Sequence, residues 1–245
     1  MAPAGIGRSL EGVHAVTAAL RAGRVEVLTV ERSRADRDDI AALIAEAEAS
    51  GLKVQSIDDV RTVAETTAPQ GVVATCRPLR TVGLEELVRQ ASPAALLVVD
   101  HVEDPHNVGA IARSAVAAGI PRMAVPDRRT ARIGAAAFKA AAGAFEHLSL
   151  SVIGSVPDAL RKLSSMGVWT VGLDAGGDQS LFGLGLFTEP VAIVVGAETG
   201  LAHLVRERVD VVASIPMASA SESLNASVAA ALACFELMRV RRDGT

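Results

Sequence analysis

Residues 94–126 read AALLVVDHVEDPHNVGAIARSAVAAGIPRMAVP, and this stretch decides the fold class. It passes from an apolar run at residues 95–99, through a segment of helical character at residues 107–119, into a second apolar run. Near-continuous apolar strands that alternate with helices are typical of a parallel sheet covered on both faces. Similar runs recur further along, so the sequence predicts an α/β domain with strands near residues 147–152, 167–173, 190–196 and 211–216.

A smaller unit precedes this domain. Residues 13–75 alternate helical and strand-like patterns, as a small βαβ-type unit does. Residues 77–93 show less apolar periodicity and end in Ser-Pro, which is typical of a linker. We therefore predict an N-terminal α/β domain at residues 1–76, a linker at 77–93 and the larger domain at 94–245.

The composition excludes several classes of protein. A hydrophobic content of 50% and a net charge of −4 exclude a disordered chain and a purely cationic coat protein. Aromatic residues make up 2% and Tyr is absent, which argues against RNA recognition by stacked aromatics. The longest apolar run, residues 226–235, is far shorter than the roughly 20 residues that span a bilayer. We expect a cytoplasmic protein with no membrane partner.

Cysteine and histidine spacing gives no metal motif. Cys76 and Cys234 lie in separate apolar segments without CxxC spacing, so we expect two buried, reduced thiols. His101 and His106 lie near one another but lack a second cluster of ligands, so no metal site is expected.

Ligands of open parallel sheets bind beyond the carboxyl ends of the strands, and polar segments follow three of the predicted strands. In the first, Asn107, Gly109 and Arg113 open a helix. From the local sequence alone, Asn107 is interpreted as an N-cap and Arg113 as a solvated helix residue. In the second, an apolar strand runs into Gly196, and Glu198 follows in a tight turn. Glycine there permits close approach of the backbone to a ligand.

The third segment joins a strand to an almost wholly apolar helix. It begins at Ile215, and Ser223-Leu224-Asn225 lead into the Ala-rich run. Either Ser223 or Asn225 is a candidate helix cap, and the small residues before them leave room for a ligand.

Taken together, the three segments resemble the signature motifs of the SpoU (TrmH-like) branch of the SPOUT RNA methyltransferases. The first matches NxGAIxRSAxAxG at residues 107–119, and the third matches IPMxxxxxSLNxSVA at residues 215–229. The second matches VxGxExxGL at residues 194–201, except that only Thr199 stands between Glu198 and the next glycine. The likeness extends over about residues 94–242. Residues 12–23 and 69–74 resemble the family's ribosomal-protein-like N-terminal domain, although its common His-Gln-Gly is Pro69-Gln70-Gly71 here.

The resemblance implies a fold, a cofactor and an assembly. It implies a trefoil-knotted parallel-sheet methyltransferase domain that binds S-adenosylmethionine at the knot, and an obligate homodimer. Composition and periodicity do not indicate the knot, which is nearly absent from other proteins. Carried over position by position, the cofactor residues are Gly196, Ile215 and Leu224, and the polar catalytic cluster is Asn107, Arg113, Glu198, Ser223 and Asn225.

The branch nearest in its motifs methylates the ribose 2′-hydroxyl of a guanosine in 23S ribosomal RNA, and we expect that activity here. Two alternatives stay open: a transfer-RNA 2′-O-methyltransferase, and a catalytically silent RNA-binding or ribosome-assembly factor of the same fold. The silent factor need not bind S-adenosylmethionine. The intact polar residues of the first and third motifs argue against it, whereas the shortened second motif argues for it.

Arg113 is our candidate for stabilising the alkoxide that develops when the ribose hydroxyl loses its proton. A guanidinium is rarely deprotonated in proteins, so we favour electrostatic activation, with a phosphate or water taking the proton. A general-base role for Arg113 stays open.

RNA binding requires contacts to phosphates, and its affinity then falls with salt. One window of the sequence is strongly basic, with only Asp127 opposing it, although such a run is often only a solvated face. The candidate RNA-binding residues are Arg122, Arg128, Arg129, Arg132 and Lys139.

Overall fold

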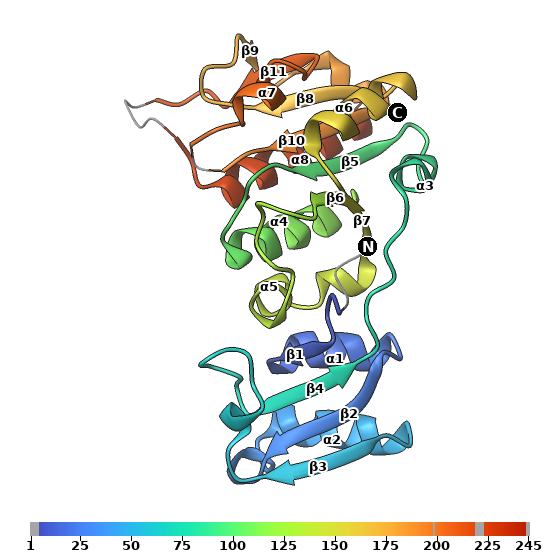
Figure 1. Cartoon of the computed structure of the whole chain (residues 1–245), viewed down its shortest axis with the longest axis vertical. Coiled ribbons are helices and arrows are strands. Elements are labelled where there is room, and N and C mark those ends of the chain that lie inside the picture. Colours follow the sequence, from blue (N-terminus) through green and yellow to red (C-terminus); the bar gives the residue numbers. More distant parts are fainter. Residues whose placement is uncertain (1–4, 198, 219–222, 244–245) are drawn as a thin grey trace.

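The parallel sheet predicted for the second part of the chain is present (Figure 1). The computed structural model describes residues 5–197, 199–218 and 223–243. Within them, seven strands pair in parallel in the order β7-β6-β5-β10-β8-β11-β9. Their bounds are β5 (Ala95–Val99), β6 (Arg122–Pro126), β7 (Ser149–Ile153), β8 (Trp169–Leu173), β9 (Gln179–Ser180), β10 (Val191–Val195) and β11 (Val211–Ser214).

Helices cover both faces of this sheet, as the continuous apolar strands require. Successive side chains of a strand point to opposite faces. Leu97 and Val99 of β5 therefore pack with one set of helices, whereas Leu96 and Val98 pack with the other. The first set is α4 (Pro105–Ala117), α5 (Ala135–Ala141) and α8 (Ala226–Asp243), and the second is α3 (Leu84–Arg89), α6 (Val156–Ser165) and α7 (His203–Arg206).

The N-terminal unit has its own four-stranded sheet, in the order β1-β4-β2-β3. Strands β2 and β3 are parallel and joined through α2, as the βαβ-type pattern predicts, while β4 runs antiparallel between β1 and β2. The elements are β1 (Ser9–Glu11), α1 (Val13–Arg21), β2 (Val25–Glu31), α2 (Asp38–Ala49), β3 (Lys53–Ile57) and β4 (Val72–Cys76).

The predicted linker packs against the second domain. Leu84 and Leu87 of α3 are buried in the core on one face of the large sheet. Thr81 forms a bridge with Leu150, and the N–H of Val82 donates to the carbonyl of Leu150 at 2.9 Å. Residues 81–89 are thus part of the second domain's packing.

A buried ion pair joins the two units. Arg24 of the N-terminal domain contacts Glu146 of the short 3₁₀ helix η3 (Ala144–His147) at 2.5 Å, and their side chains are only 11% and 2% exposed. The Arg24 guanidinium also lies 5.8 Å from the ring centroid of Phe138, which packs against the Phe145 ring at a tilt of 38°. Apolar residues of both units belong to one continuous core, so the domains are packed as a single body.

Both cysteines are free and buried, as predicted. Burial raises the pKa of the Cys76 thiol and of the Cys234 thiol to about 12. No helix among the described residues is long and apolar enough to cross a membrane.

The knot stays a prediction. The chain path from β11 to α8 passes through residues 219–222, which lie outside the described residues.

Candidate active site

A pocket opens at the carboxyl ends of β8, β10 and β11, beside the start of α8. It lies at the sheet edge where ligands of open parallel sheets bind. Gly196, Ile215 and Leu224, the three positions that the family resemblance assigns to the cofactor, all line it. The other lining residues are Leu173, Asp174, Ala175, Val195, Ala197, Thr199, Gly200, Ala213, Met217, Ser223, Ala226 and Ala229.

The turn after β10 is tightly closed. The N–H of Gly200 donates to the carbonyl of Ala197 at 2.9 Å, and Gly200 has a φ of +92°. A Cβ atom added to Gly196 would lie 2.3 Å from the carbonyl oxygen of Gly200. No side chain fits there without moving the backbone, so glycine at 196 allows this short turn. Glu198 lies outside the described residues.

Two carboxylates that we did not predict hold this turn. Asp100 follows β5 directly, and its Oδ2 accepts from the N–H of Ala202 at 2.9 Å. Asp174 follows β8, and its Oδ2 accepts from the N–H of Leu201 at 3.4 Å. Burial alone would raise the pKa of Asp174, but the N–H of Gly176 and the guanidinium of Arg206 outweigh it and leave the pKa below its ordinary value. An acidic residue directly after an apolar strand is the sequence signal that could have found both.

Helices α4 and α8 meet through two asparagines. The Nδ2 of Asn225 donates to the Oδ1 of Asn107 at 2.9 Å. The Oδ1 of Asn225 accepts from the backbone N–H of Ser227 at 2.9 Å and from its hydroxyl at 2.6 Å. Asn225 therefore caps α8, and the same side chain ties the first and third motifs together.

The prediction that Asn107 caps α4 is wrong. The helix begins at Pro105, and the Asp104 side chain accepts from the N–H of His106 at 2.8 Å. Proline is favourable at the first helical position because its missing N–H would have no partner there. The helix therefore starts earlier than predicted, and Asn107 is buried inside it, 7% exposed.

Of the other two described members of the catalytic cluster, Arg113 lies apart from this pair. Arg113 is exposed on α4 and makes no hydrogen bond or ion pair with the residues that the structure describes. Its offset of six residues from Asn107 places it on another face of the helix. Ser223 lies in the lining of the pocket.

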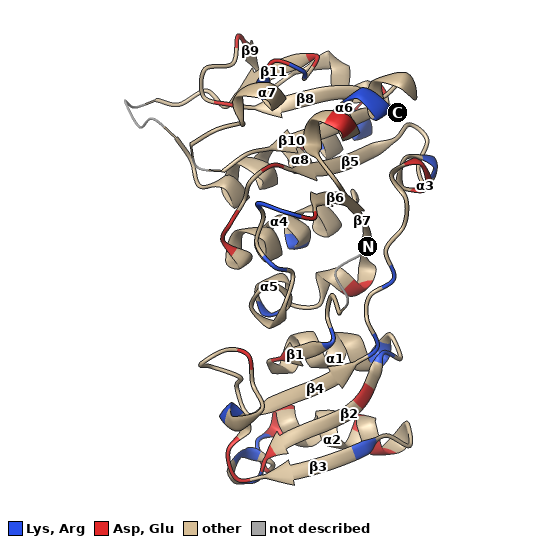
Figure 2. Cartoon of the chain, in the orientation of Figure 1, with Lys and Arg blue, Asp and Glu red and all other residues tan. Residues whose placement is uncertain are grey.

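The predicted RNA-binding residues lie in the second domain, where Figure 2 colours Lys and Arg blue, and they differ in exposure: Arg122 and Lys139 are half-buried and bonded to carbonyls, and the other three are exposed. The Nε of Arg122 donates to the carbonyl of Ala95 at 2.8 Å. The Nζ of Lys139 donates to the carbonyl of Ala68, in the N-terminal domain, at 2.8 Å. Three arginines of the loop between β6 and α5 are exposed, namely Arg128, Arg129 and Arg132.

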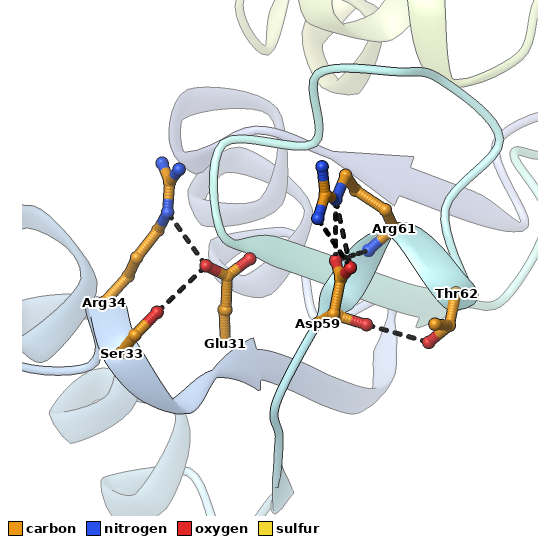
Figure 3. Close-up of polar contacts among 6 residues, drawn as sticks. All are labelled: Glu31, Ser33, Arg34, Asp59, Arg61 and Thr62. Atoms are coloured by element: carbon orange, nitrogen blue, oxygen red, sulfur yellow. Dashed lines mark hydrogen bonds and ion pairs between the residues drawn. The ribbon is translucent and has the colours of Figure 1, made fainter.

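The N-terminal domain has an open cleft where β2 and β3 end, and it includes Pro69-Gln70-Gly71. Its charged side chains pair with one another (Figure 3). Arg61 contacts Asp59 at 2.8 Å and lowers the pKa of that carboxyl to about 2. Arg34 contacts Glu31 at 3.1 Å, and the Ser33 hydroxyl donates to the same carboxylate oxygen at 3.0 Å. The cleft thus combines basic and acidic groups, most of which remain accessible.

Comparisons with known proteins agree with this architecture. Residues 94–235 match the model of the SpoU rRNA methylase family, and residues 9–82 match that of the RNA 2′-O ribose methyltransferase substrate-binding domain.

Two relatives are each named 23S rRNA (guanosine-2′-O-)-methyltransferase RlmB. The one from Ralstonia nicotianae is 39% identical over 95% of this chain and 95% of its own length. The one from Yersinia pestis is 40% identical over 94% of this chain and 96% of its own.

A solved structure shows the same fold. The SpoU methyltransferase AviRb from Streptomyces viridochromogenes, in complex with the cofactor AdoMet, matches with a TM-score of 0.78 and 23% identity. The match covers 96% of this chain and 91% of that one. The family models match both parts of the chain, and relatives align over nearly its whole length, so this chain belongs to the SpoU rRNA methylase family.

Proposed function

We propose that this protein methylates the ribose 2′-hydroxyl of a guanosine in 23S ribosomal RNA, with S-adenosylmethionine as the methyl donor. The relatives named for this reaction align over nearly the whole chain. The observation that carries the proposal is the juxtaposition of a pocket lined by Gly196, Ile215 and Leu224 with the bond between Asn107 and Asn225. A ribosomal RNA substrate is also consistent with a cytoplasmic protein.

The residues of the pocket fit this cofactor. Leu173, Ile215 and Leu224 offer apolar side chains to an adenine ring. The loops after β8 and β10 offer main-chain N–H and C=O groups, and Gly196 and Gly200 bring the backbone close without side chains. The bound cofactor supplies an electrophilic methyl group on a sulfonium sulfur.

The chain's own residues then position and activate the ribose. Positioning alone can supply up to about 7–11 kcal/mol of the barrier. Arg113, exposed and unpaired among the described residues, offers a guanidinium to the oxygen as negative charge develops on it. The bond between Asn225 and Asn107 fixes the start of α8 against α4 and orients the groups around the reacting oxygen.

We infer that the enzyme acts as a homodimer whose partner subunit completes this site. Val228 and Phe235 of α8 are 46% and 44% exposed. They are seven residues apart and therefore lie on one face of the helix. A second copy of the chain that covers this face would place its own first and third motifs beside those of its partner. Arg113, which makes no contact with the Asn107–Asn225 pair of its own chain, would then serve the partner's pocket.

RNA would be held by both domains. The exposed arginines 128, 129 and 132 lie on the loop after β6, at the same end of the sheet as the pocket. The cleft of the N-terminal domain adds Arg34 and Arg61. Contacts of this kind release counterions, so binding weakens steeply with salt.

The decisive experiment maps ribose methylation in ribosomal RNA from cells with and without the gene and repeats the reaction with purified protein. We expect one guanosine of 23S RNA to lose its 2′-O-methyl group without the gene and regain it in vitro. Methylation of transfer RNA instead would identify the protein as a transfer-RNA 2′-O-methyltransferase. A protein that neither methylates RNA nor binds S-adenosylmethionine in a calorimetric titration would be the silent factor.

A further inference from the structure

A second cavity opens at the carboxyl ends of β6 and β7, and the proposed methyl transfer does not use it. Its walls come from the segment before β1, from the end of β6 with the loop that follows, and from β7. Ile6, Ile133 and Val152 give it aliphatic surface. Its volume of about 180 Å³ exceeds the 140 Å³ of the cofactor pocket, so this β6–β7 cavity can hold a group of comparable size.

Two charged side chains of the lining are available to a ligand. Asp127 and Arg132 are exposed, and neither side chain has a hydrogen-bond or ion-pair partner among the residues described. Backbone bonds hold the segment that carries them. The N–H of Asp127 donates to the carbonyl of Ile153, and the N–H of Ala131 donates to the carbonyl of Val102, each at 2.9 Å. The β6–β7 cavity thus presents one carboxylate and one guanidinium on a fixed backbone.

The β6–β7 cavity lies near the cofactor pocket, at the same edge of the sheet. Strands β6 and β10 both pair with β5, so the two strand ends at which the cavities open are roughly 10 Å apart. Arg128 and Arg129 belong to the same loop as Asp127, and they too are exposed and have no partner in the described part of the chain. Arginines of this kind bind RNA phosphates. A strand held there would bring its bases to the β6–β7 cavity.

The chemistry of the lining favours one base. A carboxylate only accepts hydrogen bonds, and its two oxygens suit two neighbouring donors. Guanine is the base whose Watson–Crick edge offers two adjacent donor groups, N1–H and N2–H₂, beside the acceptor O6, to which arginine commonly donates. A phosphate would be repelled by Asp127. The aliphatic walls cover the faces of a base without aromatic rings, which make up only 2% of this chain.

We propose that the β6–β7 cavity binds a guanine base of the RNA substrate, with Asp127 accepting from N1–H and N2–H₂ and Arg132 donating to O6. The proposal rests on the proposed RNA methyl transfer and adds a specificity determinant to it. Bases of single-stranded RNA segments are read in this way along their Watson–Crick edges. Asp127 and Arg132 touch the RNA but not the reacting atoms, so they select the RNA that is bound.

The direction of the effect of Asp127→Ala tests the proposal. A carboxylate that is only solvated repels RNA phosphates, so its removal would raise RNA affinity at low salt. A carboxylate that binds guanine loses two hydrogen bonds instead. We therefore expect the affinity for a 23S fragment that contains the methylated guanosine to fall about 5–150-fold in fluorescence anisotropy. The free energy of unfolding should not change, because the Asp127 side chain has no partner among the residues described.

The matched control is Glu103→Ala. It removes an exposed carboxylate from the loop after β5, outside the lining of the β6–β7 cavity. Its RNA affinity should equal or exceed that of the wild type. A fall as large as that of Asp127→Ala would overturn the proposal, because loss of either carboxylate would then have the same effect.

Inosine identifies the bound base, because it lacks only the N2 amino group of guanosine. Each guanosine near the methylated ribose is replaced by inosine in turn. At one position the replacement should weaken binding to the wild type and to Glu103→Ala. At that position Asp127→Ala should bind the guanosine and inosine fragments equally, since the group that reads the amino group is gone.

The outcomes are separable from those of the proposed function. A wild type that methylates no RNA overturns the function itself. The β6–β7 cavity is then judged with 5′-GMP and 5′-IMP, of which only GMP should shift the amide NMR resonances of residues 127–133; equal shifts, or none, overturn guanine binding. An active wild type that tolerates inosine at every position overturns guanine binding alone. Raised RNA affinity in Asp127→Ala, or retained discrimination against inosine, also overturns it.

Discussion

The domain junction and helix α4 use charged side chains in opposite ways. At the junction, Arg24 and Glu146 are buried and paired with each other. On α4, Arg113 is exposed and unpaired among the described residues. Removing one member of a buried ion pair destabilises a fold, whereas the role that we propose for the exposed Arg113 is in the reaction. The comparison predicts that changes at the two places separate stability from turnover.

The largest change in stability is expected for Glu146→Ala. It leaves the Arg24 guanidinium buried without its counter-charge, and breaking a buried pair in this way costs about 3–5 kcal/mol. Urea denaturation followed by circular dichroism measures the free energy of unfolding. The matched control is Glu46→Ala, which breaks the exposed pair with Arg21 and should change the free energy far less. Equal losses in the free energy of unfolding for the two variants would contradict a stabilising role for the buried pair.

The largest change in activity is expected for Arg113→Ala. Removing a group that stabilises a developing oxyanion typically costs about 10²–10³-fold in turnover. Affinity for S-adenosylmethionine and the free energy of unfolding should remain at wild-type values, because Arg113 has no partner among the residues described. Wild-type turnover in this variant would remove Arg113 from the mechanism.

The proposed dimer makes the role of Arg113 testable in trans. Phe235→Glu should place a charge on the exposed face of α8, convert the proposed dimer to a monomer in light-scattering measurements and abolish methyl transfer. Mixing Arg113→Ala with Leu224→Arg, a variant with a blocked pocket, should restore part of the activity if each site uses its partner's arginine. A fully active monomer would contradict the proposed assembly.

Asn225 caps α8 and also bonds to Asn107 beside the pocket. Its substitution should therefore lower both the stability of the protein and its turnover, each by a moderate amount. Asn225→Ala removes the cap of α8 and should lower the free energy of unfolding by about 1 kcal/mol. It also breaks the bond to Asn107 and should slow methyl transfer. Asn225→Ser can still cap the helix but cannot reach Asn107 with an amide. Stability should therefore recover in the serine variant while turnover stays low.

The smallest expected effect is the pH dependence contributed by Asp174. Its pKa is lowered in the folded protein, so its stabilising contribution is complete above the unfolded value of about 3.9 and is lost as the pH falls through the folded pKa. The difference in free energy of unfolding between wild type and Asp174→Asn should be constant from neutral pH down to about 4 and then shrink. A difference that grows on acidification would contradict the lowered pKa.

The sequence predicted the parallel sheet well because apolar runs such as residues 95–99 and 191–195 are fully buried strands. It also indicated where to look for the pocket, since a ligand site at the carboxyl ends of such strands follows from topology. The family resemblance was needed for the identity of the reaction, and the family models confirm it.

The sequence could not predict partners that are distant along the chain. Lys139 stays a predicted RNA contact, but its hydrogen bond to a carbonyl 71 residues away in the other domain could not be read from the sequence. Arg122 donates to a carbonyl 27 residues away. The positions of Asp100 and Asp174 directly after apolar strands could have singled them out, but their partners, the N–H groups of Ala202 and Leu201, become neighbours only when the sheet forms. The local sequence shows which side chains are charged. Only the folded structure shows which of them already have hydrogen-bond partners within the protein.

The shared core of the two domains has a consequence for how a nucleotide would be chosen. Apolar residues of both units pack in one cluster, and Arg24 and Glu146 form an ion pair across the boundary. An RNA bound in the N-terminal cleft would therefore be held at a set distance from the pocket. The enzyme could then select a ribose by its distance from the bound part of the RNA, even where the neighbouring bases are not contacted.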